Sequence, residues 1–162
     1  MMRGSLIAGL IFALDRWTKH LVETRLSPYE AHTVIPGMFD IVRSSNTGVA
    51  FGLFAESSSE LREILLIVFS LGAMVILAMM LWRSRHANGT GSIALALIFG
   101  GAAGNVFDRV RVGSVTDFLD FYRGSHHWYT FNLADTAISV GAGLLLLSML
   151  RRPAVEKKRA QT

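Results

Sequence analysis

Residues 64–82 read I-L-L-I-V-F-S-L-G-A-M-V-I-L-A-M-M-L-W, a run of 19 residues without a charged side chain. At about 1.5 Å per residue, a helix of this length extends about 28 Å, close to the thickness of the hydrocarbon core of a bilayer. Hydrophobic residues make up 51% of the 162-residue chain, a high fraction for a soluble domain. The sequence therefore predicts a small all-α polytopic membrane protein, built as a single domain.

Three further segments, at 4–22, 92–110 and 133–150, are expected to form the other spans, although their purely apolar cores are shorter. Each reaches spanning length only by including polar residues at one end. These residues are, in order of the spans, Asp15 and Lys19; Asn105, Asp108 and Arg109; and Asn132 and Asp135. The first and third spans run in one direction and carry their acids near their C-terminal ends. The fourth span runs the other way and carries its acid near its N-terminal end. All three polar ends are therefore predicted to meet at one membrane face.

Basic residues set the predicted orientation. The tail after residue 150, R-R-P-A-V-E-K-K-R, is basic, which is typical of the cytoplasmic side of a span. A raw count of Lys and Arg is equal on the two faces, so the prediction discounts Arg16, Lys19 and Arg109 as embedded near acids. Both termini are then cytoplasmic, and the polar ends of the spans are extracytoplasmic.

The longest segment outside the spans, residues 27–60, contains the strand-like stretches T-V-I-P-G-M-F-D-I-V-R and G-V-A-F-G-L-F. Pro and Gly interrupt the first stretch, and N-T-G at 46–48 precedes the second. We expect a small extracytoplasmic β-rich segment that rests partly on the membrane surface, with a short interfacial helix at F-G-L-F as an alternative.

Asp117 and Asp135 bracket one loop ahead of the last apolar run. Two carboxylates that approach each other do not both ionise easily, so one can activate a water while the other supplies a proton. The alternative is that Asp135 caps the fourth helix and Asp117 is a solvated loop acid. Spacing alone leaves both interpretations open.

Five other polar residues of the spans are expected to play supporting roles. Asn105, Asp108 and Arg109 lie at i, i+3 and i+4, so they share one helix face. Asp108 and Arg109 are expected to neutralise each other or their neighbours. Asp15 and Lys19 lie at i and i+4 in the favourable order for an ion pair, which predicts an internal structural pair.

Asn46 and Gly48 belong to an N-T-G turn, and the Asn side chain could instead hold the main chain of a substrate. His126 and His127 precede Trp128. Adjacent residues point in different directions, and no Asp/Glu-x-x-His pattern accompanies them, so we predict an interfacial aromatic loop rather than a metal site. The absence of cysteine excludes disulfides and thiolate chemistry.

Together these segments resemble the bacterial lipoprotein signal peptidases (signal peptidase II) over nearly the whole chain. The motifs are D-R-W-T-K at 15–19, N-T-G-V-A-F at 46–51, G-G-A-A-G-N-V-F-D-R at 100–109, V-T-D-F-L-D-F at 115–121 and F-N-L-A-D at 131–135. The resemblance implies an aspartic endopeptidase of the bacterial cytoplasmic membrane. Such an enzyme removes the signal peptide from prolipoproteins whose cysteine carries a diacylglyceryl group, and works on the extracytoplasmic side.

The same resemblance implies a role for each matched polar residue. Asp117 and Asp135 would form the catalytic pair. Residues in contact with substrate or in support of the pair would be Asn46, Gly48, Asn105, Arg109 and Asn132, with Asp15, Lys19 and Asp108 as further supporting residues. The implied partners are a lipid-modified prolipoprotein and membrane lipids, with no nucleic acid, no metal and no cofactor, and the chain is expected to act as a monomer.

Two other functions are compatible with a small membrane protein of this kind. A proton-coupled transporter would use Asp15, Asp108 and Asp135 as proton relays, but these acids are predicted at one face rather than along a path across the bilayer. A structural membrane subunit would leave the paired Asp117 and Asp135 without a role.

Overall fold

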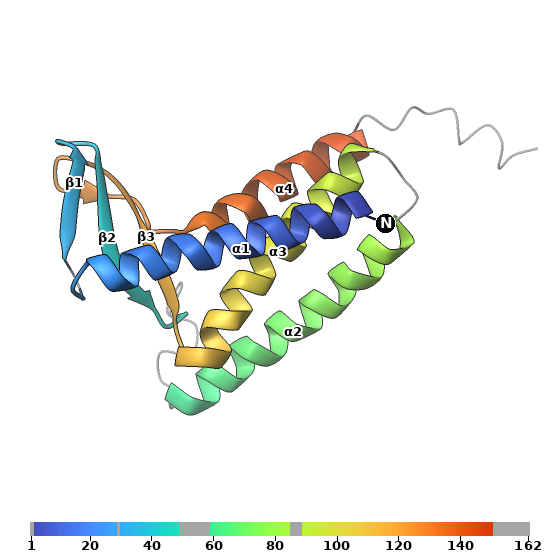
Figure 1. Cartoon of the computed structure of the whole chain (residues 1–162), viewed down its shortest axis with the longest axis horizontal. Coiled ribbons are helices and arrows are strands. Elements are labelled where there is room, and N and C mark those ends of the chain that lie inside the picture. The colour runs from blue at the N-terminus through green and yellow to red at the C-terminus, as the bar shows by residue number, and fades with distance from the viewer. Residues whose placement is uncertain (1, 29, 49–58, 85–88, 151–162) are drawn as a thin grey trace, which may run out of the picture.

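The computed structural model describes residues 2–28, 30–48, 59–84 and 89–150. In these residues the chain order is α1 (Met2–Arg25), β1 (Ala31–Ile35), β2 (Phe39–Asn46), α2 (Ser59–Arg83), α3 (Thr90–Val112), β3 (Val115–Arg123), β4 (His126–His127) and α4 (Leu133–Leu150). The helices form a bundle, and the sheet covers the end of it that lies away from the N-terminus (Figure 1).

All four helices predicted from the sequence are confirmed as helices, and each predicted range lies within the observed one. Of the described helices, three are long and apolar enough to cross a membrane: α2 over Ile64–Arg83, α3 and α4. α1 has 24 residues but does not meet this criterion, because charged residues interrupt its apolar sequence.

Close contact of α3 with both α1 and α4 depends on glycine. A Cβ atom on Gly100 would lie 2.6 Å from the carbonyl oxygen of Ala8 in α1, and one on Gly101 would lie 2.5 Å from that of Ala134 in α4. Any larger residue would force the helices apart, as at small-residue interfaces of membrane helices generally. The small residues of G-G-A-A-G-N therefore allow close packing, and α3 is the central helix of the bundle.

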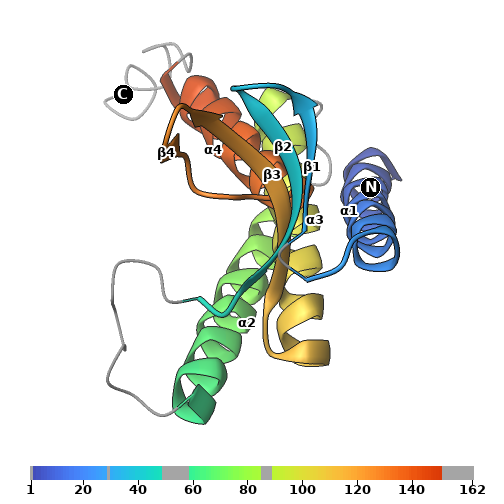
Figure 2. The same ribbon diagram turned by 90° about the vertical axis from the view of Figure 1, so that its left-hand side faces the viewer.

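The strands form one antiparallel succession in the order β1-β2-β3-β4. Figure 2 looks onto this sheet, which lies in front of α3 and α4, with α1 at one side and α2 at the other. The prediction of a β-rich segment within 27–60 is correct for β1 and β2 but incomplete, because β3 and β4 come from the connection between α3 and α4. The predicted alternatives for F-G-L-F at 51–54 lie outside the described residues.

The assignment of Asp117 to a loop is wrong, because it lies in β3. α3 ends at Gly113, whose φ of 75° is left-handed, a conformation that favours glycine. The following V-T-D-F-L-D-F-Y is rich in β-branched and aromatic residues, and it pairs with β2. This pairing fixes the position of Asp117, which a loop would not.

Candidate active site

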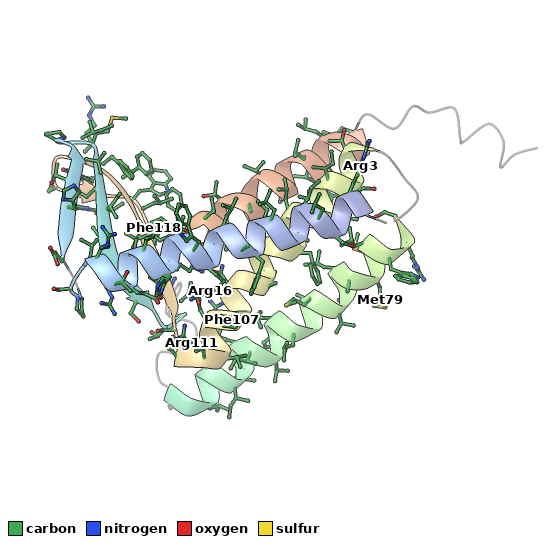
Figure 3. The ribbon with its side chains drawn as sticks, in the orientation of Figure 1. Arg3, Arg16, Met79, Phe107, Arg111 and Phe118 are labelled. Carbon is green, nitrogen blue, oxygen red and sulfur yellow. The ribbon has the colours of Figure 1, made fainter. Side chains whose placement is uncertain are left out.

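The polar ends of α1, α3 and α4 meet beneath the sheet, as the parity of the spans predicted. Asp15 Oδ1 of α1 accepts a hydrogen bond from the backbone N–H of Ala134 at the start of α4, at 3.0 Å. Lys19 of α1 donates to Asn105 Oδ1 of α3 at 2.9 Å. In Figure 3, Arg16, Arg111 and Phe118 lie toward this end, and Arg3 lies at the other.

Four charged residues form an ion cluster, defined here as Asp15, Arg16, Lys19 and Asp108. Lys19 Nζ lies 2.9 Å from Asp15 Oδ2 and 2.7 Å from Asp108 Oδ2, and Arg16 pairs with Asp108 Oδ1. The side chains of Asp15 and Lys19 are 0% exposed. The formal charges of the cluster cancel, which is the condition under which ionised groups are tolerated away from water.

The predicted ion pair of Asp15 with Lys19 is thus confirmed. The expected partner of Asp108 is corrected in part, because Asp108 is neutralised by its neighbours Arg16 and Lys19 and has no ion pair with Arg109. The reason is geometric: the buried Lys19 ammonium reaches both acids across the contact between α1 and α3. The charge of Arg109 acts on Asp135, Asp117 and Asp108 without a direct ion pair to any of them.

A second group of polar residues surrounds the two predicted catalytic acids, and we call it the aspartate–amide cluster (Asp117, Asp135, Asn46, Asn105, Asn132). Asp117 Oδ1 accepts from Asn132 Nδ2 at 2.7 Å, and Asp117 Oδ2 accepts from Asn46 Nδ2 at 2.9 Å. Asp135 Oδ1 accepts from Asn105 Nδ2 at 2.7 Å. The amides of Asn132 and Asn105 are themselves joined at 3.3 Å, so one chain of hydrogen bonds connects the two acids.

Backbone pairing explains why Asn132 meets Asp117. Phe131 pairs with Leu119 of β3 in both directions, with N–O distances of 2.8 and 3.1 Å. This places the next residue, Asn132, beside Asp117. Asn132 Oδ1 also accepts from the backbone N–H of Asp135 at 2.9 Å, an N-cap bond at the start of α4. One asparagine therefore holds both acids.

The alternative interpretations of the two acids do not fit this geometry. Asp117 is 1% exposed, so it is not a solvated loop acid. Asn132 rather than Asp135 supplies the N-cap oxygen of α4, and the Asp135 carboxylate remains available on the first turn.

Burial raises the pKa of the Asp117 carboxyl from its ordinary value of 3.8 to about 6. The negative charge of Asp135 raises this pKa further, whereas the amide hydrogen bonds from Asn46 and Asn132 lower it. A carboxyl group in this state exchanges its proton near neutral pH. The arrangement can therefore hold one acid protonated and the other ionised.

The predicted N-T-G turn forms, and its asparagine side chain contacts one of the two acids. Gly48 has a φ of 79°, and its N–H donates to Asn46 Oδ1 at 2.8 Å, so the predicted turn is confirmed. The amide nitrogen of the same Asn46 side chain donates to Asp117. The turn thus fixes the asparagine that orients one carboxylate.

Sequence reasoning missed Asp120, which is buried although it lies three residues after Asp117 on β3. Its Oδ2 lies 2.8 Å from His127 Nδ1, and the His127 ring stacks on Tyr122. Strand alternation alone would not have revealed it, because residues three apart on a strand point to opposite faces and the burial along β3 does not alternate regularly. No group of three or more potential metal-ligating side chains occurs among the described residues.

Comparisons with known proteins agree with this arrangement. The family model of signal peptidase (SPase) II matches residues 7–151. The lipoprotein signal peptidase of Solibacter usitatus is 54% identical over 145 residues, covering 90% of this chain and 88% of that protein. The lipoprotein signal peptidase of Desulforapulum autotrophicum is 46% identical over 142 residues, covering 87% of each chain.

Two solved structures share the fold, and both are described as bacterial membrane enzymes determined by the in meso method. The one at 2.3 Å resolution has a TM-score of 0.73 and 27% identity, and the match covers 91% of this chain and 87% of that one. The one at 1.9 Å resolution has a TM-score of 0.73 and 26% identity, and covers 93% and 94%. Sequence and fold together place this chain in the signal peptidase II family of membrane aspartic peptidases.

Proposed function

We propose that this protein cleaves the signal peptide from diacylglyceryl-modified prolipoproteins, with Asp117 and Asp135 as the catalytic pair. The observation that carries the assignment is the aspartate–amide cluster, in which two acids share one network of amides and have no ion-pair partner among the described residues. The names of the relatives supply the substrate class.

The proposed reaction uses one ionised and one protonated carboxyl group. The ionised aspartate removes a proton from water, and the water oxygen attacks the scissile carbonyl carbon. The protonated aspartate hydrogen-bonds the carbonyl oxygen and transfers its proton there as the tetrahedral intermediate forms. A proton then passes to the amide nitrogen, the C–N bond breaks, and the carbonyl re-forms. Each turnover consumes one water and leaves the pair with one proton.

The supporting residues differ in what they do for this pair. Asn105 and Asn132 fix the two carboxylates in mutual orientation through the bonds described above. Asn46, held by the turn at Gly48, donates a hydrogen bond to the Oδ2 atom of Asp117 and fixes its position. Arg109 supplies a positive charge that acts on both acids and would stabilise the negative charge that develops on the substrate.

The ion cluster contacts two neighbours of the catalytic acid Asp135. Asp15 accepts from the backbone of Ala134, next to Asp135, and Lys19 donates to Asn105, which binds Asp135. A cluster with two contacts to the neighbours of one catalytic acid positions that acid without touching the substrate.

The proposed topology has four spans with both termini cytoplasmic and the site extracytoplasmic. α1 would be the remaining span, in addition to α2, α3 and α4. Its charged residues Asp15 and Lys19 are completely buried against each other and do not face lipid. The sheet would then lie outside the membrane, where the 27–60 segment can cover a bound peptide. A reporter that is active only in the periplasm should be inactive when fused after Thr162, and activity there would contradict the topology.

The test of function uses the purified full-length chain in detergent with a diacylglyceryl-modified prolipoprotein. We expect conversion to the shorter product on a gel, without added metal or cofactor and by the monomer. The unmodified prolipoprotein should be cleaved far more slowly. Proton flux in vesicles without any peptide cleavage would instead support the transporter.

A further inference from the structure

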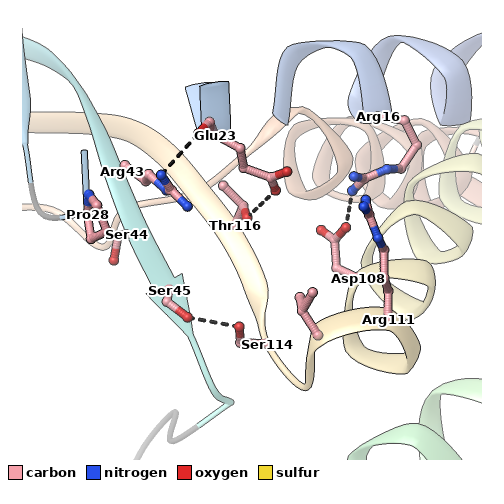
Figure 4. A pocket seen from close by; sticks show the side chains of 11 residues that line it. Arg16, Glu23, Pro28, Arg43, Ser44, Ser45, Asp108, Arg111, Ser114 and Thr116 are labelled. Carbon is pink, nitrogen blue, oxygen red and sulfur yellow. Dashed lines mark hydrogen bonds and ion pairs between the residues drawn. The ribbon is translucent and has the colours of Figure 1, made fainter. Parts of the chain in front are cut away.

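A cavity of about 300 Å³ lies on the other side of β3 from the catalytic pair. Thr116 lines the cavity, whereas its neighbour Asp117 binds Asn46 and Asn132, as expected because successive residues of a strand point to opposite faces. The cavity lies between the ends of α1 and α3 and the strands β2 and β3 (Figure 4). The cavity is therefore separate from the aspartate–amide cluster, although Arg16 and Asp108 of the ion cluster belong to its wall.

The charged side chains of the cavity wall are three arginines and two acids: Arg16, Arg43, Arg111, Glu23 and Asp108. Their formal sum is +1. Asp108 neutralises the arginines of the cavity less than this sum implies, because its second carboxylate oxygen forms an ion pair with Lys19 at 2.7 Å. The cavity therefore carries an excess of positive charge.

Two of the arginines are held in place. Arg43 donates to the backbone carbonyl oxygens of Glu23 at 3.0 Å and Leu26 at 2.9 Å. Arg16 pairs with Asp108, and its guanidinium carbon lies 4.9 Å from the centre of the Phe107 ring. Their guanidinium groups are therefore oriented before any ligand arrives, which lowers the entropic cost of binding.

Arg111 differs from them, because it has no hydrogen-bond or ion-pair partner among the described residues. Figure 4 shows its side chain reaching from the end of α3 toward Arg16 and Asp108. The Asp108 carboxylate at this place is already paired with Arg16 and Lys19, so the Arg111 guanidinium remains available to an added anion. Ser45 and Ser114, joined at 2.8 Å, add hydroxyl groups to the same wall.

The surfaces on both sides of these arginines are apolar and exposed. Val110 and Val112 flank Arg111 and are 64% and 62% exposed, and Trp17, next to Arg16, is 59% exposed. In the proposed topology, in which α1 and α3 both cross the membrane, such side chains would contact hydrocarbon. An anion in the cavity would then lie beside acyl chains, at the ends of the helices where lipid headgroups are found.

We propose that this cavity binds the phosphodiester headgroup of a phospholipid, with Arg111 and Arg16 on the phosphate and the acyl chains along the exposed residues of α1 and α3. Arginine suits the task because its planar fork of donors matches phosphate oxygens. The proposal does not depend on the peptidase assignment, because neither Arg111 nor the cavity takes part in the proposed cleavage.

Native mass spectrometry of the full chain in detergent tests this assignment. With dioleoylphosphatidylglycerol, the parent protein should retain one lipid more tightly than it retains dioleoylglycerol, which lacks the phosphate. Arg111→Glu should weaken retention of the phospholipid by roughly tenfold or more, since a charge-assisted contact is replaced by repulsion. Arg111→Gln should weaken it by severalfold.

Arg25→Glu is the matched control. Arg25 is an exposed basic residue in the last turn of α1, as Arg111 is in the last turn of α3, but it does not line the cavity. It should change retention by less than twofold. Equal loss in both Glu variants, or equal retention of dioleoylglycerol, would overturn the proposal. Binding of inorganic phosphate that depends on Arg111 and displaces the phospholipid at millimolar concentration would assign the cavity to a free anion and overturn the lipid assignment.

Discussion

The ion cluster and the aspartate–amide cluster are adjacent and each contains a buried carboxylate, yet their carboxylates are stabilised in opposite ways. Asp15 and Asp108 each have a cation within 2.9 Å, whereas among the described residues Asp117 and Asp135 accept hydrogen bonds only from asparagine amides. An acid paired with a cation has its charge compensated and holds helices together. An acid held by neutral amides beside another acid keeps a proton that it can exchange, so the difference separates structural from chemical carboxylates.

The largest effect should follow from removing proton exchange in the aspartate–amide cluster. Asp117→Asn and Asp135→Asn preserve shape but cannot accept or deliver the proton. Each should reduce prolipoprotein cleavage by roughly a thousandfold or more, about 4 kcal/mol in activation free energy. The double variant should be little worse than either single one, because the pair acts as a unit. A gel-shift cleavage assay measures all three.

Asp120→Asn is the control for that experiment. Asp120 is also a buried acid of β3, but it binds His127 rather than the amides. The Asp120→Asn variant should cleave the prolipoprotein at a rate within about tenfold of the parent rate. Near-parental cleavage by Asp117→Asn or Asp135→Asn would remove that residue from the catalytic pair.

Breaking the ion cluster should instead destabilise the fold. Lys19→Met leaves Asp15 and Asp108 buried close together, with Arg16 as the one remaining ion-pair partner among the described residues. We expect a loss of about 3 kcal/mol or more in the free energy of unfolding, seen as a lower folded yield and a lower thermal midpoint in detergent. Asp15→Asn combined with Lys19→Met should recover part of this loss, because the pair is removed together. If the Lys19→Met protein were stable but did not cleave the prolipoprotein, Lys19 would have a direct role in catalysis.

The pH dependence of stability should also distinguish the clusters. The Asp117 carboxyl has a pKa of about 6 when folded, against an ordinary 3.8, so between these values the folded protein holds a proton that the unfolded chain has lost. Its contribution to stability is therefore present below pH 4 and is lost as the pH rises to 6, by up to about 3 kcal/mol. Asp117→Asn lacks this dependence.

The measurement is the thermal midpoint of both proteins from pH 4 to pH 7. The midpoint of Asp117→Asn relative to that of the parent should rise from pH 4 to pH 6 and then stay level. A constant difference over the range would show that the pKa of Asp117 is not raised by folding.

The features of the structure that the sequence predicted correctly are those that depend on local sequence pattern. Apolar length was enough for the four helices, and i, i+4 spacing was enough for the Asp15–Lys19 pair. The partners of Asp108 could not be predicted, because they depend on how α1 packs against α3, a contact set by glycines such as Gly100. Likewise β3 was taken for a loop, because its partner β2 lies about 75 residues earlier in the sequence and strand pairing is not a local property.

Asn105 of the aspartate–amide cluster also binds the ion cluster, and its substitution should give the smallest but most specific effect. Its Oδ1 accepts from Lys19 at 2.9 Å, and its Nδ2 donates to Asp135 at 2.7 Å. Asn105→Ala should therefore lower the free energy of unfolding by about 1–2 kcal/mol and lower cleavage by about tenfold through misplacement of Asp135. Asn46→Ala is the matched comparison, because Asn46 binds Asp117 but has no contact with the ion cluster. It should lower cleavage to a similar extent with less loss of stability, and equal losses of stability in the two variants would mean that Asn105 does not connect the clusters energetically.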